Sequence, residues 1–303
     1  MFEPIKLHAE GPIFSRIVSG VMSWGVWGKD YRTQDAEKLI QQAIDLGITT
    51  FDHADIYGHY TTESLFGPFM KANPSLREKM QLVTKCGIKL ITENRPTHKI
   101  NSYDTSRQYI FDAVEQSLRN LGTDYLDLLL IHRPSPLMDP DEISEAIDML
   151  KAAGKVLHFG VSNFTPSQMA LMASRHTIVT NQIEAHLLHL DPFLDGSLDY
   201  CLEHRFRPMA WSPLGGSRFF KQQADPQVER IIKVAKEIGV RHGNKSLDQV
   251  LLAWLLRHPA GILPVLGTGR IERLQAAKEA LSIELSREEW FELWSASTGV
   301  SVP

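Results

Sequence analysis

The sequence predicts an α/β fold, a closed (β/α)8 TIM barrel that spans residues 1–303 as one domain. Short runs rich in apolar and β-branched residues alternate with amphipathic helical patterns along most of the chain. Eight such strand–helix units fit into 303 residues, as a barrel of this kind requires. The rival doubly wound nucleotide-binding fold should carry Gly-x-Gly-x-x-Gly after its first strand, and residues 20–28 do not supply it.

The strand elements follow in order from the N-terminus. Residues 5–15 are expected to form a β-hairpin that turns at Gly11 and Pro12. Several of the later apolar runs are continuous, as expected for strands covered on both faces. The barrel strands are predicted at 16–22, 48–52, 81–86, 126–132, 156–162, 178–183, 207–211 and 262–266.

Helical patterns lie between these strands. In the first, 33–46, Ala36, Ile40 and Ala43 fall on one face, and Gly47 follows its end. The clearest others are 105–121 and 165–175. The patterns 226–239, 246–257 and 287–296 exceed the eight helices of a barrel, so extra C-terminal helices are expected.

Composition excludes several classes of function. A net charge of −4 gives no electrostatic reason to bind nucleic acid or an anionic membrane. No apolar run approaches the roughly 20 residues of a membrane span, and the first residues lack a secretory signal pattern. The two cysteines, Cys86 and Cys201, imply no disulfide framework. We therefore expect a cytoplasmic protein with a small-molecule substrate; its oligomeric state is left open.

Four side chains capable of catalysis follow predicted strands. Asp52 and Tyr57 follow the second strand, Lys85 lies in the third, and His132 ends the fourth. Each alone also fits a structural role, such as a turn cap, a core ring, a solvated terminus or a hydrogen-bonded scaffold. Because the C-terminal strand ends of a barrel form a single site, their convergence favours a catalytic site.

A set of short motifs, running in order from strand to strand, resembles the aldo-keto reductase family, bacterial NADPH-dependent type. Each motif is weak alone, whereas the ordered set is specific and covers essentially the whole chain. The motifs are Phe51-Asp52-x-Ala54-x-x-Tyr57-Gly58, Thr84-Lys85-Cys86-Gly87, Leu130-Ile131-His132, Gly160-Val161-Ser162-Asn163-Phe164, Asn181-Gln182-Ile183-Glu184, Trp211-Ser212-Pro213-Leu214-Gly215 and Gly267-Thr268-Gly269-x-x-x-Arg273.

The resemblance implies an NADPH-dependent oxidoreductase of the CH–OH class that reduces aldehydes or ketones to alcohols. Tyr57 would protonate the carbonyl oxygen while the nicotinamide gives hydride to the carbon. A free phenol has a pKa near 10, and the ammonium of Lys85 is expected to lower it by stabilising phenolate. Asp52 would hold Lys85 charged and aimed, and His132 would hydrogen-bond the substrate oxygen.

The same resemblance assigns the NADPH/NADP+ site. Ser162, Asn163 and Gln182 would hold the carboxamide, with the nicotinamide stacked on Trp211. Arg273 matches the family's arginine for the 2′-phosphate, which favours NADPH. The residues implied in cofactor binding are Gly20, Val21, Met22, Asp52, Ser162, Asn163, Gln182, Trp211, Ser212, Pro213, Leu214, Gly215, Gly267, Thr268, Gly269 and Arg273.

The chain departs from the family pattern at the adenosine end. Gly267 stands where many members carry lysine, and Ala276 and Ala277 replace an acidic–amide pair that contacts adenine. Cofactor binding would then be looser, or reinforced elsewhere.

Trp24 and Trp27 are expected to line the substrate pocket together with Tyr57 and His132. The polar segments 89–104 and 217–225 are candidates to fold over substrate and cofactor. No Cys, His or carboxylate pattern completes a metal site at familiar spacing.

Two other functions stay open. The first is a nicotinamide-binding regulatory or scaffold protein with slow turnover. The second is a barrel isomerase or lyase in which Lys85 forms a Schiff base. The identity of the substrate is not predicted, because it depends on loop side chains.

Overall fold

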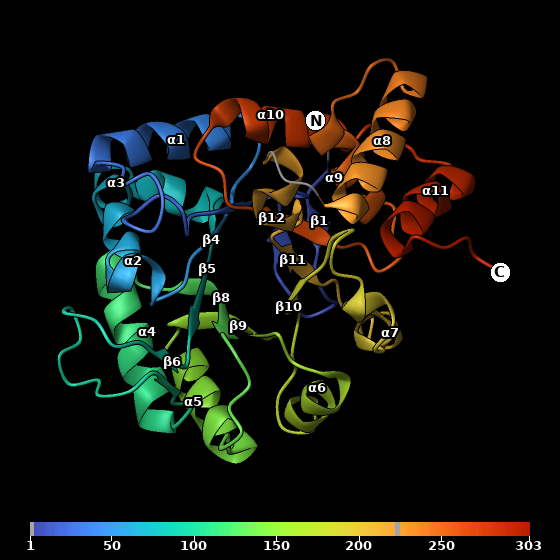
Figure 1. Cartoon of the computed structure of the whole chain (residues 1–303). Helices are drawn as coiled ribbons and strands as arrows, with labels where there is room; N and C mark the ends of the chain where they lie inside the picture. Colours follow the sequence, from blue (N-terminus) through green and yellow to red (C-terminus); the bar gives the residue numbers. More distant parts are fainter. Residues whose placement is uncertain (1–2, 222–224) are drawn as a thin grey trace.

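The computed structural model, which describes residues 3–221 and 225–303, contains a closed barrel of parallel strands surrounded by helices (Figure 1). This confirms the predicted fold class. The last barrel strand returns to the first, with Val265 paired to Val18. The barrel strands are β3 (Val18–Gly20), β4 (Thr50–Asp52), β5 (Gln81–Cys86), β8 (Leu126–Ile131), β9 (Val156–Ser162), β10 (Asn181–Glu184), β11 (Met209–Trp211) and β12 (Leu263–Leu266).

The predicted N-terminal hairpin is present as β1 (Ile5–Lys6) paired antiparallel with β2 (Ile13–Phe14). Leu7 and Phe14 belong to the same buried cluster as the barrel-lining Val83 and Leu128. The carbonyl oxygen of Leu7 accepts a hydrogen bond from the backbone of Arg207, which precedes β11. The hairpin therefore covers the N-terminal end of the barrel and leaves the opposite end for the site.

Helices pack around the barrel and are fixed by local capping. Ser106 caps α4, which ends at Gly122 in the left-handed conformation, and Thr165 with Gln168 forms a capping box on α6. The helices around the strands are α1 (Thr33–Asp45), α2 (Tyr57–Tyr60), α3 (Gly67–Ala72), α4 (Arg107–Leu121), α5 (Pro140–Ala152), α6 (Pro166–Ala173), α7 (Ser197–Glu203), α9 (Leu247–Leu256) and α10 (Ile271–Ala280). Short 3-10 helices are η1 (Thr62–Leu65), η2 (Pro74–Lys79), η3 (Asp191–Phe193) and η4 (Gly215–Phe220).

Two further helices, α8 (Pro226–Arg241) and α11 (Arg287–Thr298), lie together beside the barrel at the right of Figure 1. The ring of Trp290 stacks on Trp254 of α9 at 5.0 Å, and each indole N–H donates to the other's backbone carbonyl. Arg230 of α8 donates to the carbonyl oxygen of Ala296. These contacts confirm the expected additional C-terminal helices.

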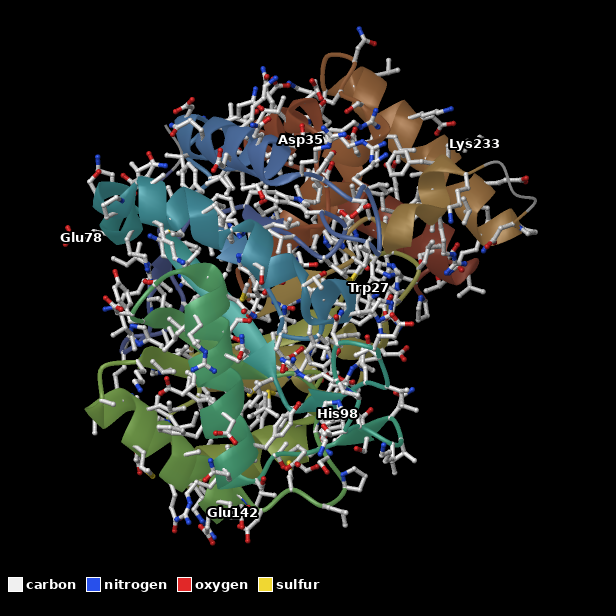
Figure 2. All side chains as sticks on the ribbon, turned by 90° about the vertical axis from the view of Figure 1, so that its left-hand side faces the viewer. Trp27, Asp35, Glu78, His98, Glu142 and Lys233 are labelled. Atoms are coloured by element: carbon white, nitrogen blue, oxygen red, sulfur yellow. The ribbon has the colours of Figure 1, made fainter. Side chains whose placement is uncertain are left out.

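A second small hairpin, β6 (Ile88–Lys89) with β7 (Ser102–Tyr103), brackets the polar segment after β5. Figure 2 shows His98 of this segment and Trp27 on one side of the molecule, and Glu78, which precedes β5, on the opposite side. No helix in the described ranges is both long and apolar enough to cross a membrane.

Candidate active site

The Lys85 ammonium is the centre of a buried hydrogen-bond cluster at the C-terminal strand ends. Its Nζ lies 2.8 Å from Asp52 Oδ2, 2.7 Å from the carbonyl oxygen of His53 and 3.2 Å from Tyr57 Oη. The Lys85 side chain is only 1% exposed. An ammonium has three protons to donate, so this environment satisfies all of them and keeps a buried cation tolerable.

Asp52 links this cluster to the far side of the barrel. Its second oxygen, Oδ1, accepts a hydrogen bond of 2.8 Å from Gln182 Nε2 on β10. The hydroxyl of Ser162 on β9 donates to the backbone carbonyl oxygen of Gln182 at 2.9 Å. The carboxylate of Asp52 therefore binds Lys85 through Oδ2 and is fixed by Gln182 through Oδ1.

Burial and charge act in opposite directions on the two proton-carrying groups. Burial alone would lower the pKa of Lys85, but Asp52 and Tyr57 raise it above its ordinary value. Burial raises the pKa of Tyr57, and the nearby Lys85 only partly opposes this. Lys85 does lower the pKa of Tyr57, as expected, but desolvation outweighs the ammonium, so the pKa of Tyr57 lies above its ordinary value. Both groups keep their protons at neutral pH.

His132 faces Tyr57 across the site, with ring centroids 6.0 Å apart and planes at 80°. Burial lowers the pKa of His132 well below its usual value, and the positive charges of Lys85 and Arg133 lower it further. The ring is therefore neutral at neutral pH. Its Nδ1 is enclosed and has no hydrogen-bond partner among the residues that the structure describes.

The chain after β4 bends sharply to bring Tyr57 back over the strand end. Gly58, His59 and Tyr60 all have positive φ, at 58°, 57° and 69°. A Cβ on Gly58 would lie 2.4 Å from Thr62 Oγ1, so only glycine fits there. This strained turn supports a functional site at the adjacent phenol.

A cavity of about 640 Å³ opens above the cluster at the strand ends. It brings together most of the residues expected for catalysis, cofactor and substrate. Those that line it are Gly20, Met22, Trp27, Asp52, Tyr57, His132, Ser162, Asn163, Gln182, Trp211, Ser212, Pro213, Leu214, Gly267, Thr268 and Arg273. Lys85 lies beneath it, in contact with Tyr57.

Comparison with known proteins shows which family the chain belongs to. A sequence model described as the Aldo/keto reductase family matches residues 16–297. The chain belongs to the aldo/keto reductase family. An oxidoreductase of Bacillus subtilis called YcsN, described as uncharacterized, is 47% identical over 297 residues, covering 97% of this chain and 98% of its own. A protein of Agrobacterium fabrum named 6-dehydroglucose reductase is 45% identical over 292 residues, covering 95% and 96%.

The solved structures extend the likeness to three dimensions. A crystal structure of the thermostable aldo-keto reductase Tm1743 with the inhibitor epalrestat matches with a TM-score of 0.82 and 29% identity, covering 97% of this chain and 100% of that one. As a member of the family, this aldo-keto reductase is an oxidoreductase that reduces carbonyl groups. Aldo-keto reductases use nicotinamide cofactors.

Besides Lys85, four residues expected in the site do not line the cavity of this aldo-keto reductase: Val21, Trp24, Gly215 and Gly269. Trp24 is the clearest correction, because its indole is 1% exposed and stacks on Phe66 at 6.3 Å. Trp27 does line the cavity, and its ring lies 6.1 Å from that of Tyr57. The two tryptophans could not be distinguished by pattern, since aromatic residues serve cores and pockets alike.

The structure adds lining residues that the motifs did not indicate. Some lie beside a motif residue, as Ile56 beside Tyr57 and Arg133 beside His132, and adjacency was the only available signal. The added residues are Ser23, Ile56, Ile88, Arg133, Gly216, Phe220, Asp248, Leu252, Val265 and Leu266.

The two candidate loops differ in position. No residue of 89–104 lines the main cavity; Arg95 and His98 line a neighbouring hollow instead, so this segment is not part of the cavity wall. Phe220 of the second segment does line the cavity. Residues 222–224 of that segment lie outside the described residues.

The cavity has two ends that fit a dinucleotide. At the catalytic end, Trp211 Nε1 donates to Asn163 Oδ1 at 2.9 Å, and Asn163 Nδ2 donates to Ser162 Oγ at 2.8 Å, which places amide and hydroxyl groups beside a flat ring. At the other end, a Cβ on Gly267 would meet nothing within 4 Å, so the backbone before α10 is open to a phosphate. Arg273 lines that end as a cation.

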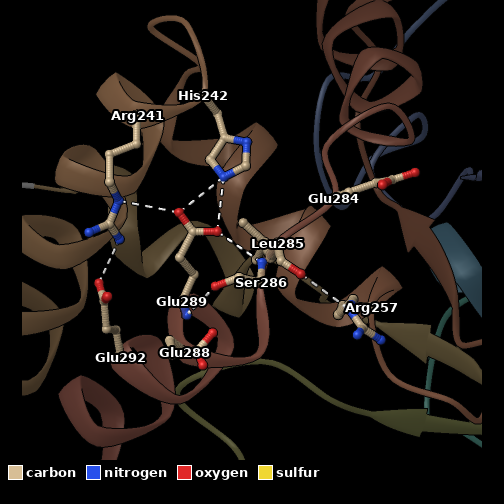
Figure 3. Close-up of a pocket in the computed structure, with 9 residues that line it drawn as sticks. All are labelled: Arg241, His242, Arg257, Glu284, Leu285, Ser286, Glu288, Glu289 and Glu292. Carbon is tan, nitrogen blue, oxygen red and sulfur yellow. Dashed lines mark hydrogen bonds and ion pairs between the residues drawn. The ribbon is translucent and has the colours of Figure 1, made fainter.

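A larger, more open hollow of about 860 Å³ lies away from the strand ends, where α8 and α9 end and α11 begins (Figure 3). Four of its charged groups form one network: Glu289 accepts from His242 and pairs with Arg241, which also pairs with Glu292. Arg257 donates to the Leu285 carbonyl oxygen. We do not assign it to the active site. Within the described ranges, no group of three or more His, Cys, Asp or Glu side chains could hold a metal ion.

Proposed function

We propose that this aldo-keto reductase reduces aldehyde or ketone carbonyls to alcohols, with NADPH as the hydride donor and Tyr57 as the general acid. The observation that carries the proposal is the contact of Tyr57 Oη with buried, Asp52-paired Lys85 beneath the cavity that Trp211 lines. The bound nicotinamide would supply a hydride to the carbonyl carbon.

The chain's own residues then manage the proton and the charge on oxygen. Tyr57 is protonated at neutral pH, because a phenol has a pKa near 10 and burial raises that of Tyr57 further, so the proton is available for transfer. As negative charge develops on the substrate oxygen, the proton moves from Tyr57 Oη to that oxygen. The resulting phenolate lies beside Lys85, whose charge Asp52 maintains.

His132 would orient the same oxygen as a neutral donor. Its enclosed Nδ1 has no acceptor in the described chain, and leaving a lone pair unpaired costs less than leaving an N–H unpaired. The proton of the neutral ring therefore belongs on Nε2, which is free to donate to the substrate.

The test uses purified protein, NADPH and a panel of aldehydes, including 6-dehydroglucose because two relatives carry the name 6-dehydroglucose reductase. We expect oxidation of NADPH, followed by absorbance, in the presence of aldehyde. Tyr57→Phe should lower kcat by about 100- to 10,000-fold, the size of a lost general acid. Its NADPH affinity should stay within about twofold. Unchanged kcat in Tyr57→Phe would remove the proposed acid.

We also propose that Arg273 favours NADPH by pairing with the 2′-phosphate. Ala277 is buried in the core, so that position offers no adenine contact and the arginine is the main cation at this end. Arg273→Ala should weaken NADPH binding by about tenfold or more while NADH binding changes little. Exposed Arg270→Ala, outside the cavity lining, is the control. Equal losses for both cofactors in Arg273→Ala would contradict the assignment.

A Schiff-base role for Lys85 is not favoured, because a nucleophilic amine must lose its proton, and here Asp52 raises the lysine pKa. We propose that the protein is cytoplasmic, because its two cysteines are both free and buried, which suits a reducing compartment.

A further inference from the structure

Arg133 is a cation that the catalytic cluster does not use. It follows His132 directly at the end of β8 and lines the main cavity, partly buried. Its guanidinium carbon lies 5.8 Å from the centre of the Trp211 ring. The cation is therefore held at the catalytic end, where the carbonyl of a substrate would be reduced.

Apart from the Trp211 ring, the guanidinium has no partner in the ranges 3–221 and 225–303. No carboxylate lies within 4.0 Å of it, and no described side chain or carbonyl accepts a hydrogen bond from it. A guanidinium has five N–H donors in a planar fork, and partial burial reduces what water can satisfy. These donors are available to a ligand in the cavity.

The charge balance at this end of the cavity points to the kind of ligand. The Lys85 ammonium and the Asp52 carboxylate cancel as a buried pair, and His132 is neutral. The cavity's other charged lining residues, Asp248 and Arg273, come from α9 and α10 at the proposed adenosine end. With Arg133, the net charge of this end of the cavity is therefore one positive charge, beside the place where the carbonyl would react.

We infer that Arg133 is a specificity-determining residue that binds a carboxylate on the substrate, so that the favoured substrates are aldehydes or ketones that also carry an acid group. The inference rests on the proposed carbonyl reduction and names its substrate class. The planar guanidinium fork matches the two oxygens of a carboxylate, which gives both attraction and orientation.

The first experiment compares matched aldehydes on the native enzyme with saturating NADPH. The pairs are succinic semialdehyde against butanal, and 3- or 4-carboxybenzaldehyde against the methylbenzaldehyde of the same substitution. We expect kcat/KM to be at least tenfold higher for the carboxylated member of at least one pair. The advantage should shrink as salt is raised, because the attraction between charges is screened.

The second experiment measures the ratio of kcat/KM for the carboxylated over the neutral member in variants. In Arg133→Gln, this ratio should fall by about 10- to 100-fold, the effect of losing charge-assisted hydrogen bonds. Arg133→Lys should retain part of it, since charge is kept and the fork is lost. Exposed Arg107→Gln, which is outside the cavity lining, is the matched control and should keep the native ratio.

Three results would overturn the inference. The first is a native enzyme that reduces neutral aldehydes with no preference for any carboxylated partner. The second is an unchanged ratio in Arg133→Gln, which would leave Arg133 only a role in positioning His132. The third is a loss of NADPH affinity in Arg133→Gln as large as the loss in the ratio, which would place the guanidinium on the cofactor. Failure to reduce any aldehyde would instead contradict the proposed function itself.

Discussion

His53, next to Asp52 of the proposed catalytic cluster, is fully buried, and its ring lacks hydrogen-bond partners in the described part of the chain. The ring packs edge-on against Phe66 at 4.7 Å. Its backbone carbonyl, however, accepts from Lys85. Burial, with a contribution from Lys85, lowers the pKa of His53 to about 3. The imidazole is therefore neutral in the folded protein under ordinary conditions.

This residue makes the protein sensitive to acid. The unfolded chain binds a proton at His53 below pH 6.5, whereas the folded chain does not until about pH 3. The stability that neutral, buried His53 allows is thus fully present above pH 6.5 and is lost as the pH falls from 6.5 toward 3. At pH 5.5, the loss is about 1.4 kcal/mol relative to pH 7.5.

Urea unfolding at pH 7.5 and 5.5 measures this effect. Between pH 7.5 and 5.5, the free energy of unfolding should fall by about 1.4 kcal/mol less in His53→Leu than in the native chain. His204→Gln, at a more exposed histidine, should behave as native. If His53→Leu and the native chain lose the same stability on acidification, the buried imidazole is not the sensor.

At the residue scale, the sequence predicted that Asp52, Tyr57 and Lys85 come together because they stand at strand ends, where a barrel must bring them together. It could not predict that desolvation outweighs Lys85 at Tyr57, since burial depends on residues distant in sequence. Nor could it predict Arg133, because a charged residue beside a motif also fits a solvated loop.

At the scale of elements, a buried arginine ties η2 to the barrel strands. Arg77 Nη2 lies 2.8 Å from Asp127 Oδ2 on β8 and 2.8 Å from the Tyr125 carbonyl oxygen. The same carboxylate oxygen accepts from the backbone N–H of Leu82 on β5 at 2.8 Å. This network therefore fixes the segment that enters β5, the strand that carries Lys85.

Removing Arg77 should destabilise the fold without touching the cavity. Arg77→Ala leaves Asp127 buried without its cation and is expected to lower the free energy of unfolding by about 3–5 kcal/mol. Arg107→Ala, which breaks an exposed pair with Glu145, should cost less than about 1 kcal/mol. Urea unfolding at neutral pH measures both. Equal, small losses would show that the Arg77 network adds little.

The predicted elements agree with the structure in order and type but less well in length. The run 178–183 predicted a strand that the structure places at Asn181–Glu184, and 16–22 became Val18–Gly20. An apolar run reports burial, whereas strand length is set by the neighbours available for pairing in a tilted barrel. The β6–β7 hairpin was missed because its polar segment has no alternating pattern.

At the scale of the molecule, barrel closure creates the site. Pairing of β12 with β3 joins the two ends of the chain, which supports our proposal that residues 1–303 act as one domain. It also brings residues from early, middle and late segments into one cavity, such as Tyr57, Gln182 and Arg273. The order of motifs predicted this convergence, whereas the charge balance within the cavity required the assembled structure.

The central claim is that a nicotinamide hydride passes to a carbonyl carbon while Tyr57 supplies the proton. It is tested most directly with NADPH that carries deuterium at both C4 positions of the nicotinamide and an aldehyde that the enzyme reduces. Mass spectrometry and NMR of the product should find one deuterium on the new alcohol carbon and none on its oxygen after exchange. An alcohol formed without that deuterium would contradict the account.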